Sequence, residues 1–82
     1  MLEELRWKIL DFLAGEKRYA KKDIVEAEEI AKQLNIGVDY VHEELDKMKL
    51  LGWVELHKIF GPKYSAQITP MGLLAHEQAG KD

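Results

Sequence analysis

The feature that most constrains the fold is a pair of short amphipathic segments separated by only three residues. The first segment, residues 27–34, places Ile30, Ala31 and Leu34 on one face at helical spacing. The intervening residues 35–37 read Asn-Ile-Gly, and asparagine and glycine both tolerate the positive φ angles of a tight turn. Because so short a turn holds two helices side by side, the sequence predicts a helix–turn–helix unit.

The segment after this turn has the longer apolar repeat. Val41, Leu45 and Met48 follow an i, i+4, i+7 pattern, which predicts a helix from residue 38 to residue 50 or 51. Gly52 is a suitable end for this helix, because glycine favours the residue that follows a helix C-terminus.

A helix is also predicted before the pair, over Leu2–Ala14, with Gly15 as its C-terminal stop. Helical spacing places five apolar side chains on its inward face: Leu2, Leu5, Ile9, Phe12 and Leu13. Trp7, Leu10 and Ala14 fall toward the other side of this helix. Two interpretations of Trp7 remain open, namely packing on a neighbouring loop and contact with a second subunit.

The second half of the chain predicts a β-hairpin followed by a last helix. Residues 53–59 and 64–69 alternate apolar and polar side chains, as half-buried antiparallel strands do, around a tip that contains Gly-Pro. Thr69 is a favourable N-cap and Pro70 a favourable first helical residue, so a short helix is expected over residues 71–78.

The run AEEIAKQLNIGVDYVHEELDKMKLLGWVEL, followed by YSAQITPMG, resembles a winged helix-turn-helix domain of the prokaryotic and archaeal transcription-regulator type. The V…L…M…LG-x-V rhythm of residues 41–54 is the most specific part of this resemblance, which covers residues 2–78. It implies an α+β, mostly helical fold: a three-helix core, a short strand at Ile24–Val25, a two-stranded β-wing and a short C-terminal helix. A length of 82 residues leaves room for one domain, residues 1–82.

The residue inventory excludes several classes of function. The sequence has no cysteine, which excludes disulfides, thiolate zinc sites and cysteine nucleophiles. His42, His57 and His76 lie on three different predicted elements without paired metal-ligand spacing, so neither an enzyme nor a bound cofactor is expected. The N-terminus is acidic, unlike a signal peptide, and no apolar run approaches the roughly 18 residues of a membrane span. We therefore expect a cytoplasmic protein without a membrane partner.

The resemblance implies binding to double-stranded DNA, with the second helix of the pair in the major groove and the hairpin on the backbone. The groove-facing residues would be Val38, Asp39, Tyr40, His42, Glu43, Asp46 and Lys47. Phosphate contacts would come from Lys58 and Lys63 on the wing. The connector after the predicted first helix, residues 16–23, is the most basic stretch of the chain and would add Lys17, Arg18, Lys21 and Lys22.

The charge of the second helix keeps another interpretation open. Residues 38–50 contain four acidic and two basic side chains, and the chain has a net charge of −3, whereas DNA-binding surfaces are usually basic. A winged helix with this charge could instead bind a protein partner, for which the candidate anchors are Trp7, Trp53, Ile59 and Phe60. In addition, helix-turn-helix proteins commonly act as dimers, and we predict a homodimer with Trp7, Leu10 and Leu74 at the interface.

Overall fold

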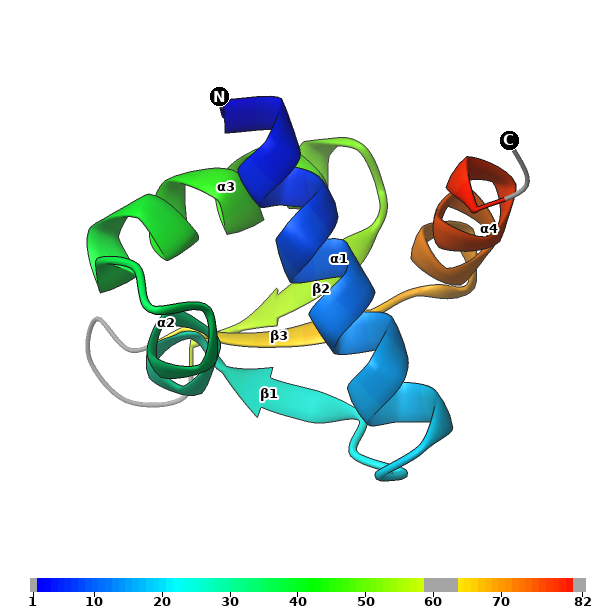
Figure 1. Ribbon diagram of the computed structural model, residues 1–82, viewed down its shortest axis with the longest axis horizontal. Coiled ribbons are helices and arrows are strands. Elements are labelled where there is room, and N and C mark those ends of the chain that lie inside the picture. Colours follow the sequence, from blue (N-terminus) through cyan, green and yellow to red (C-terminus); the bar gives the residue numbers. More distant parts are fainter. Residues whose placement is uncertain (1, 59–63, 81–82) are drawn as a thin grey trace.

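Helices and strands alternate along the chain in the computed structural model, which describes residues 2–58 and 64–80 (Figure 1). In chain order the elements are α1 (Leu2–Arg18), β1 (Ile24–Glu26), α2 (Ala27–Leu34), α3 (Val38–Leu50), β2 (Val54–His57), β3 (Ser65–Ile68) and α4 (Pro70–Ala79). Within the described residues, the fold is therefore α+β and mostly helical, with four helices and one antiparallel sheet of three strands.

The strand β3 is the centre of the sheet and pairs with β1 on one side and β2 on the other. Ala66, in the middle of β3, lies between Val25 of β1 and Leu56 of β2. One face of the sheet is buried, with Val25 of β1, Val54 of β2, and Ala66 and Ile68 of β3. Along β3 these buried residues alternate with half-buried ones, as expected for a strand with one face in the core. α1 crosses in front of β3 in Figure 1 and contacts it, so this face of the sheet is part of the core.

The predicted strands are confirmed, although their lengths differ from the prediction. β1 contains the expected Ile24–Val25 and makes the sheet three-stranded, whereas the predicted hairpin alone would have two strands. β2 and β3 are each four residues long, shorter than the alternating segments around them. The predicted hairpin tip, including Ile59, Phe60 and Lys63, lies outside the described residues.

The helix α1 is longer than predicted, because Gly15 does not end it. The space around Gly15 is open, and its carbonyl accepts a hydrogen bond from the amide of Tyr19, which continues the helical pattern. Lys17 and Arg18 occupy the last turn, where positive charge interacts favourably with the helix dipole. None of the helices in the described part of the chain has the length and apolar character needed to cross a membrane.

The predicted helix–turn–helix unit is present as α2 and α3. Asn35 adopts the left-handed conformation with φ 56°, and the amide of Ile36 donates to the carbonyl of Ala31, which closes the end of α2. Gly37 has φ −68°, so the turn needs only one left-handed residue, Asn35, and does not use the tolerance of glycine for positive φ. The ring of Tyr40 lies against Gly37, where an added Cβ would be 3.3 Å from Tyr40 Cδ2.

The predicted cap of α4 is also confirmed. The hydroxyl of Thr69 accepts a hydrogen bond from the amide of Gly72 at 3.0 Å, and Pro70 is the first helical residue. The same hydroxyl donates to the carbonyl of Gly52 at 2.6 Å. Thr69 thus joins the start of α4 to the turn between α3 and β2.

Replacing Thr69 with alanine should destabilise the domain by about 1–2 kcal/mol, because both hydrogen bonds of its hydroxyl are lost. Thr69→Ser retains the hydroxyl, so its loss of folding stability should be only a few tenths of the loss caused by Thr69→Ala. Urea unfolding monitored by tryptophan fluorescence measures both values. Equal losses for the two variants would show that the methyl group, and not the cap, carries the contribution.

Candidate functional site

The face of α3 that points to solvent is acidic. α3 buries Val41, Leu45 and Met48, as predicted, and leaves Asp39, Glu43 and Asp46 exposed, with Tyr40 beside them at 59% exposure. None of the three exposed carboxylates forms an ion pair with a described residue. This surface therefore has unneutralised negative charge together with an aromatic ring.

A stack of side chains joins α3 to the hairpin. The rings of His42 and Tyr64 lie nearly parallel, 24° apart, with their centroids separated by 4.4 Å. The ammonium of Lys58 lies 4.4 Å from the centroid of the Tyr64 ring, a cation–π contact that contributes about 0.5–1 kcal/mol at exposed sites. Two of the predicted DNA-binding residues, His42 of α3 and Lys58 after β2, are thus brought together around one tyrosine.

A groove of about 390 Å³ lies beside this stack, at the start of both α2 and α3. The lining residues include Val38, Asp39 and His42, three of the residues predicted to face the DNA groove. Val38 is half-buried and packs against the core, so the prediction that it faces outward is only partly correct. Glu26 and Glu28 add two further carboxylates to the lining.

Three of the four phosphate-binding cations predicted on the connector are paired with carboxylates of the chain itself. Lys17 Nζ lies 2.6 Å from Asp23 Oδ1, and Lys22 donates a hydrogen bond to Glu29. That hydrogen bond from Lys22 to Glu29 raises the pKa of the Lys22 ammonium above its ordinary value. Lys21 is exposed, has φ 58° and forms no ion pair with any residue in the described ranges.

The guanidinium of Arg18 is paired with side chains of α4. Its guanidinium lies 3.1 Å from Glu77 Oε1 and donates to Nδ1 of His76 at 3.3 Å. The other ring nitrogen of His76 lies 2.8 Å from Asp11 Oδ1, so three polar contacts tie the C-terminal part of α1 to α4. Arg18 makes these contacts from the last turn of α1, so they favour continuation of the helix past Gly15.

The three histidines have separate partners. His42 stacks on Tyr64, His57 lies 3.0 Å from the side-chain oxygen of Gln67, and His76 contacts Asp11 and Arg18. No group of three His, Asp or Glu side chains within the described residues is arranged to hold a metal ion.

A buried ion pair between Arg6 and Glu44 was missed by the sequence analysis. Glu44 is 0% exposed, and its Oε1 accepts from Arg6 Nε at 3.0 Å, while its Oε2 lies 3.5 Å from Lys47 Nζ. The signal was present in the sequence, because residue 44 lies three after Val41 and one before Leu45, on the inward face of the helix. Lys47, predicted to contact DNA, is therefore already close to a carboxylate.

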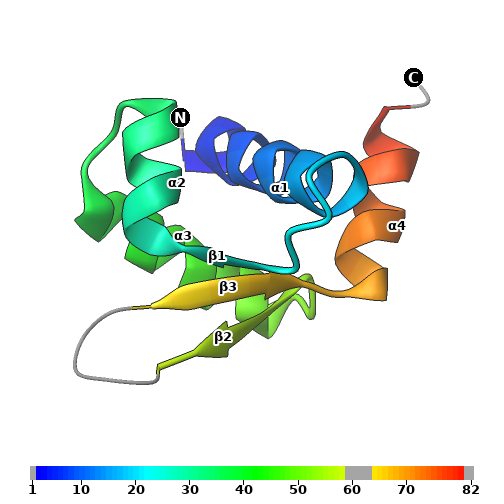
Figure 2. The same cartoon turned by 90° about the horizontal axis from the view of Figure 1, so that it is seen from below.

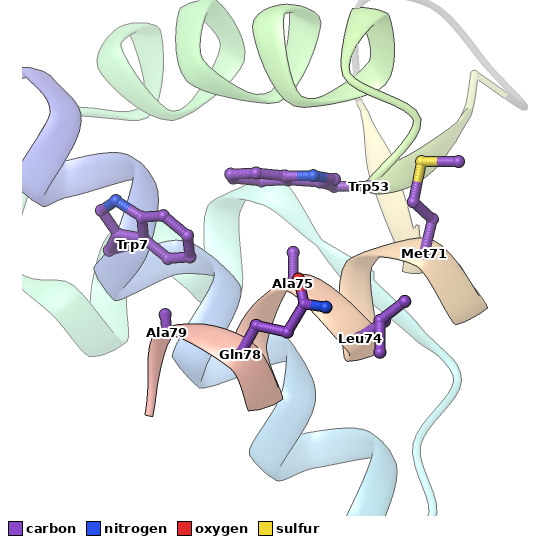
Figure 3. A pocket seen from close by; sticks show the side chains of 7 residues that line it. All are labelled: Trp7, Trp53, Met71, Leu74, Ala75, Gln78 and Ala79. Carbon is purple, nitrogen blue, oxygen red and sulfur yellow. The ribbon is translucent and has the colours of Figure 1, made fainter. Parts of the chain in front are cut away.

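The second prominent surface is an open apolar hollow between α1 and α4 (Figure 3). It has a volume of about 740 Å³, and the rings of Trp7 and Trp53, with centroids 5.0 Å apart, form one wall. Trp7 is 40% and Leu74 is 52% exposed, so two of the three predicted dimer residues lie on this hollow. Leu10 is 0% exposed and is not available at any interface, because α1 is covered on several sides by α2, α3, β3 and α4.

Comparison with protein-family models, with curated proteins and with solved structures finds no match to this chain.

Proposed function

We propose that the protein is a winged-helix transcriptional regulator that binds double-stranded DNA through α3 and the β2–β3 hairpin. The observation that supports this proposal is the order α1-β1-α2-α3-β2-β3, in which a short turn precedes α3 and a hairpin follows it. The N-terminal half of α3 has an exposed face with Asp39, Tyr40 and Glu43, and the His42–Tyr64 stack holds this half beside the hairpin. A helix and a wing placed side by side can occupy a groove and the adjacent backbone together. The proposal places the chain in the cytoplasm.

In this proposal DNA binding is weak, because the α3 surface is acidic and few unpaired lysines are available to contact phosphates. The connector residues Lys17 and Lys22 are ion-paired, and the connector lies at the end of the molecule opposite the α2–α3 turn in Figure 1. Attraction to phosphates must come mainly from the exposed Lys58 and from Lys63, against the carboxylates of α3. A carboxylate on α3 such as Glu43 can still accept a hydrogen bond from cytosine N4 in the major groove.

Replacing Glu43 with glutamine tests this arrangement. Binding of a random-sequence duplex should tighten by about threefold at low salt, because one negative charge is removed from the surface that faces phosphates. The advantage should fade as the salt concentration rises through physiological values. Fluorescence anisotropy of a labelled duplex over a salt series measures both effects.

The matched control is Glu16→Gln, which removes the same charge near the connector, away from α3. This variant should bind DNA like the wild type, apart from the small effect of net charge. If both variants tighten binding equally, or if the wild-type chain does not bind duplex DNA even at low salt, the proposed interface on α3 is wrong.

The unpaired acidic face of α3 favours a second candidate function, docking onto a basic protein partner. Asp39, Glu43 and Asp46 repel phosphates but attract lysine and arginine side chains, and Tyr40 offers an aromatic contact of the kind enriched in interfaces. A poly-lysine peptide serves as the probe. Two results together would support this function. The wild type should bind the peptide but not duplex DNA, and Glu43→Gln should no longer bind the peptide.

A further inference from the structure

The sheet has a free edge at β1. Figure 2 shows the three strands side by side in the order β1, β3, β2, and in Figure 1 no helix or strand lies directly below β1. The amide of Ala27 donates to the carbonyl of Tyr64 just beyond the end of β1. Bonded pairs recur at every second residue of an antiparallel ladder, so Val25 and Ala66 form the next one. The residues on either side of Val25 therefore direct their backbone groups away from β3.

Three backbone groups lie along this edge, namely the amide and carbonyl of Ile24 and the amide of Glu26. None of them forms a hydrogen bond with a residue in the described part of the chain. Ile24 is 45% exposed and Glu26 is also exposed, so a second chain can reach these groups. The opposite edge of the sheet is less accessible, because Val54 of β2 is only 2% exposed. An unpaired and accessible strand edge is a template for a further strand.

The side chains of β1 determine what an added strand must carry. Ile24 and Glu26 are exposed while Val25 between them is buried, so the two exposed side chains share the outer face of the sheet. Residues directly opposite each other on neighbouring strands contact one another through their side chains. An apolar side chain therefore fits beside Ile24, and a lysine or arginine two residues along the added strand fits beside Glu26.

The groove of about 390 Å³ at the start of α2 and α3 adds negative charge at the end of this edge. Glu26, Glu28 and Asp39 all line the groove, and none of the three forms an ion pair within the described residues. Lys22, a cation of the neighbouring connector, already donates a hydrogen bond to Glu29. Charge complementarity therefore favours a strand with a cationic side chain and disfavours an acidic one.

We propose that β1 binds an extended segment of a partner protein, which adds a strand to the sheet with an apolar residue beside Ile24 and a lysine or arginine beside Glu26. Hydrogen bonds to the three backbone groups of the edge pair the strands, and the cationic side chain lies toward the acidic groove. Neither Ile24 nor Glu26 belongs to α3, so this inference does not rest on the proposed contact of α3 with DNA or with a basic partner.

A blocked pentapeptide with the sequence Lys-Thr-Val-Thr-Lys is the probe, because a lysine lies two residues from the valine in either strand direction. Titration of the isotope-labelled full chain, followed by NMR at low salt, should give a dissociation constant of about 1 mM or below. Hydrogen exchange of the Ile24 amide should slow by about fivefold at saturating peptide, because a bonded amide exchanges only when the bond opens.

Two control peptides separate strand pairing from charge. N-methylation of the valine removes the N–H that donates to the Ile24 carbonyl in an antiparallel pair and should weaken binding by about tenfold. Replacement of both lysines with glutamate should abolish binding. Equal binding of the methylated and parent peptides would overturn the proposal, as would unchanged exchange of the Ile24 amide, because charge alone then accounts for binding. Absence of binding of the parent peptide at about 5 mM would also overturn it.

Variants of the chain test the same edge. Ile24→Pro removes an amide that is not bonded to β3, and proline is tolerated on edge strands, so this variant should remain folded by circular dichroism and bind the peptide at least about tenfold more weakly. Glu26→Gln should weaken binding by about threefold at low salt. The matched control is Glu43→Gln, which removes one charge from α3 outside the groove and should bind this peptide like the wild type. Equal weakening by Glu26→Gln and Glu43→Gln would show that net charge holds the peptide and would overturn the proposal. Binding of duplex DNA is measured separately, so a failure at β1 leaves the proposed function untouched.

Discussion

Replacing Gly72 with alanine is expected to destabilise the domain by about 3 kcal/mol, although the change adds a single methyl group. A Cβ at this position would lie 2.3 Å from the carbonyl oxygen of Trp53 and 2.9 Å from Ile68 Cγ1. The nearer atom belongs to the backbone and cannot rotate away. The same carbonyl accepts the amide hydrogen bond of Thr69, so relief of the clash must separate α4 from the start of β2.

The matched control is Gly15→Ala in α1, where no atom lies within 4 Å of the added Cβ apart from the chain neighbours and the backbone of the same helix. Alanine there should stabilise the helix by about 0.5–1 kcal/mol, because glycine loses more backbone entropy on folding. Urea and thermal unfolding of the two variants should therefore change in opposite directions, and Gly72→Ala should lower the Tm by more than about 10 °C. Similar stability of Gly72→Ala and the wild type would mean that α4 is not packed as closely on β2 as described.

The helix–turn–helix unit could be predicted from the sequence because its determinants are local. The i, i+4, i+7 spacing of Val41, Leu45 and Met48 depends only on helical geometry, and the observed α3 begins and ends where this spacing indicates. The cap at Thr69 is also local, since its partner Gly72 is three residues away. Short-range physics of this kind needs no knowledge of the tertiary fold.

The errors in α1 have a tertiary cause. Gly15 is a plausible helix stop by itself, but Arg18 reaches Glu77, which is 59 residues later in the sequence, and this contact favours continued helix. Leu10 was predicted on an outer side because an amphipathic helix on a surface has one buried face. In this fold α1 is covered on several sides, so Leu10 and Ala14 are as buried as Ile9.

The acidic charge of the α3 surface could be predicted from the sequence, but the ion pairs of the connector lysines could not. The acidic face of α3 follows from helical spacing, and Asp39 and Glu43 are exposed as expected. The pairing of Lys17 with Asp23 and of Lys22 with Glu29 depends on how the connector folds back, which composition does not encode. Charge runs therefore overestimate the positive charge that is available to a phosphate.

The ion pair between Arg6 and Glu44 links α1 to α3 inside the domain. Glu44 is fully buried, the side chain of Arg6 is 21% exposed, and no buried side-chain polar atom of the described residues lacks a hydrogen-bond partner. A buried ion pair adds little net stability compared with apolar residues of the same size, because both charges lose their hydration. Removal of one partner is different, since the remaining charge stays buried without compensation.

Replacing Arg6 with leucine should therefore destabilise the domain by about 3 kcal/mol, the lower end for a broken buried pair, because Lys47 remains 3.5 Å from the Glu44 carboxylate. The double variant Arg6→Leu/Glu44→Leu should recover most of that loss, because no charge is then left without a partner. Lys47→Ala is the control: this side chain is 46% exposed, and its loss should cost less than about 1 kcal/mol. If the double variant is no more stable than Arg6→Leu, the cost arises from lost packing of the arginine side chain and not from an unpaired carboxylate.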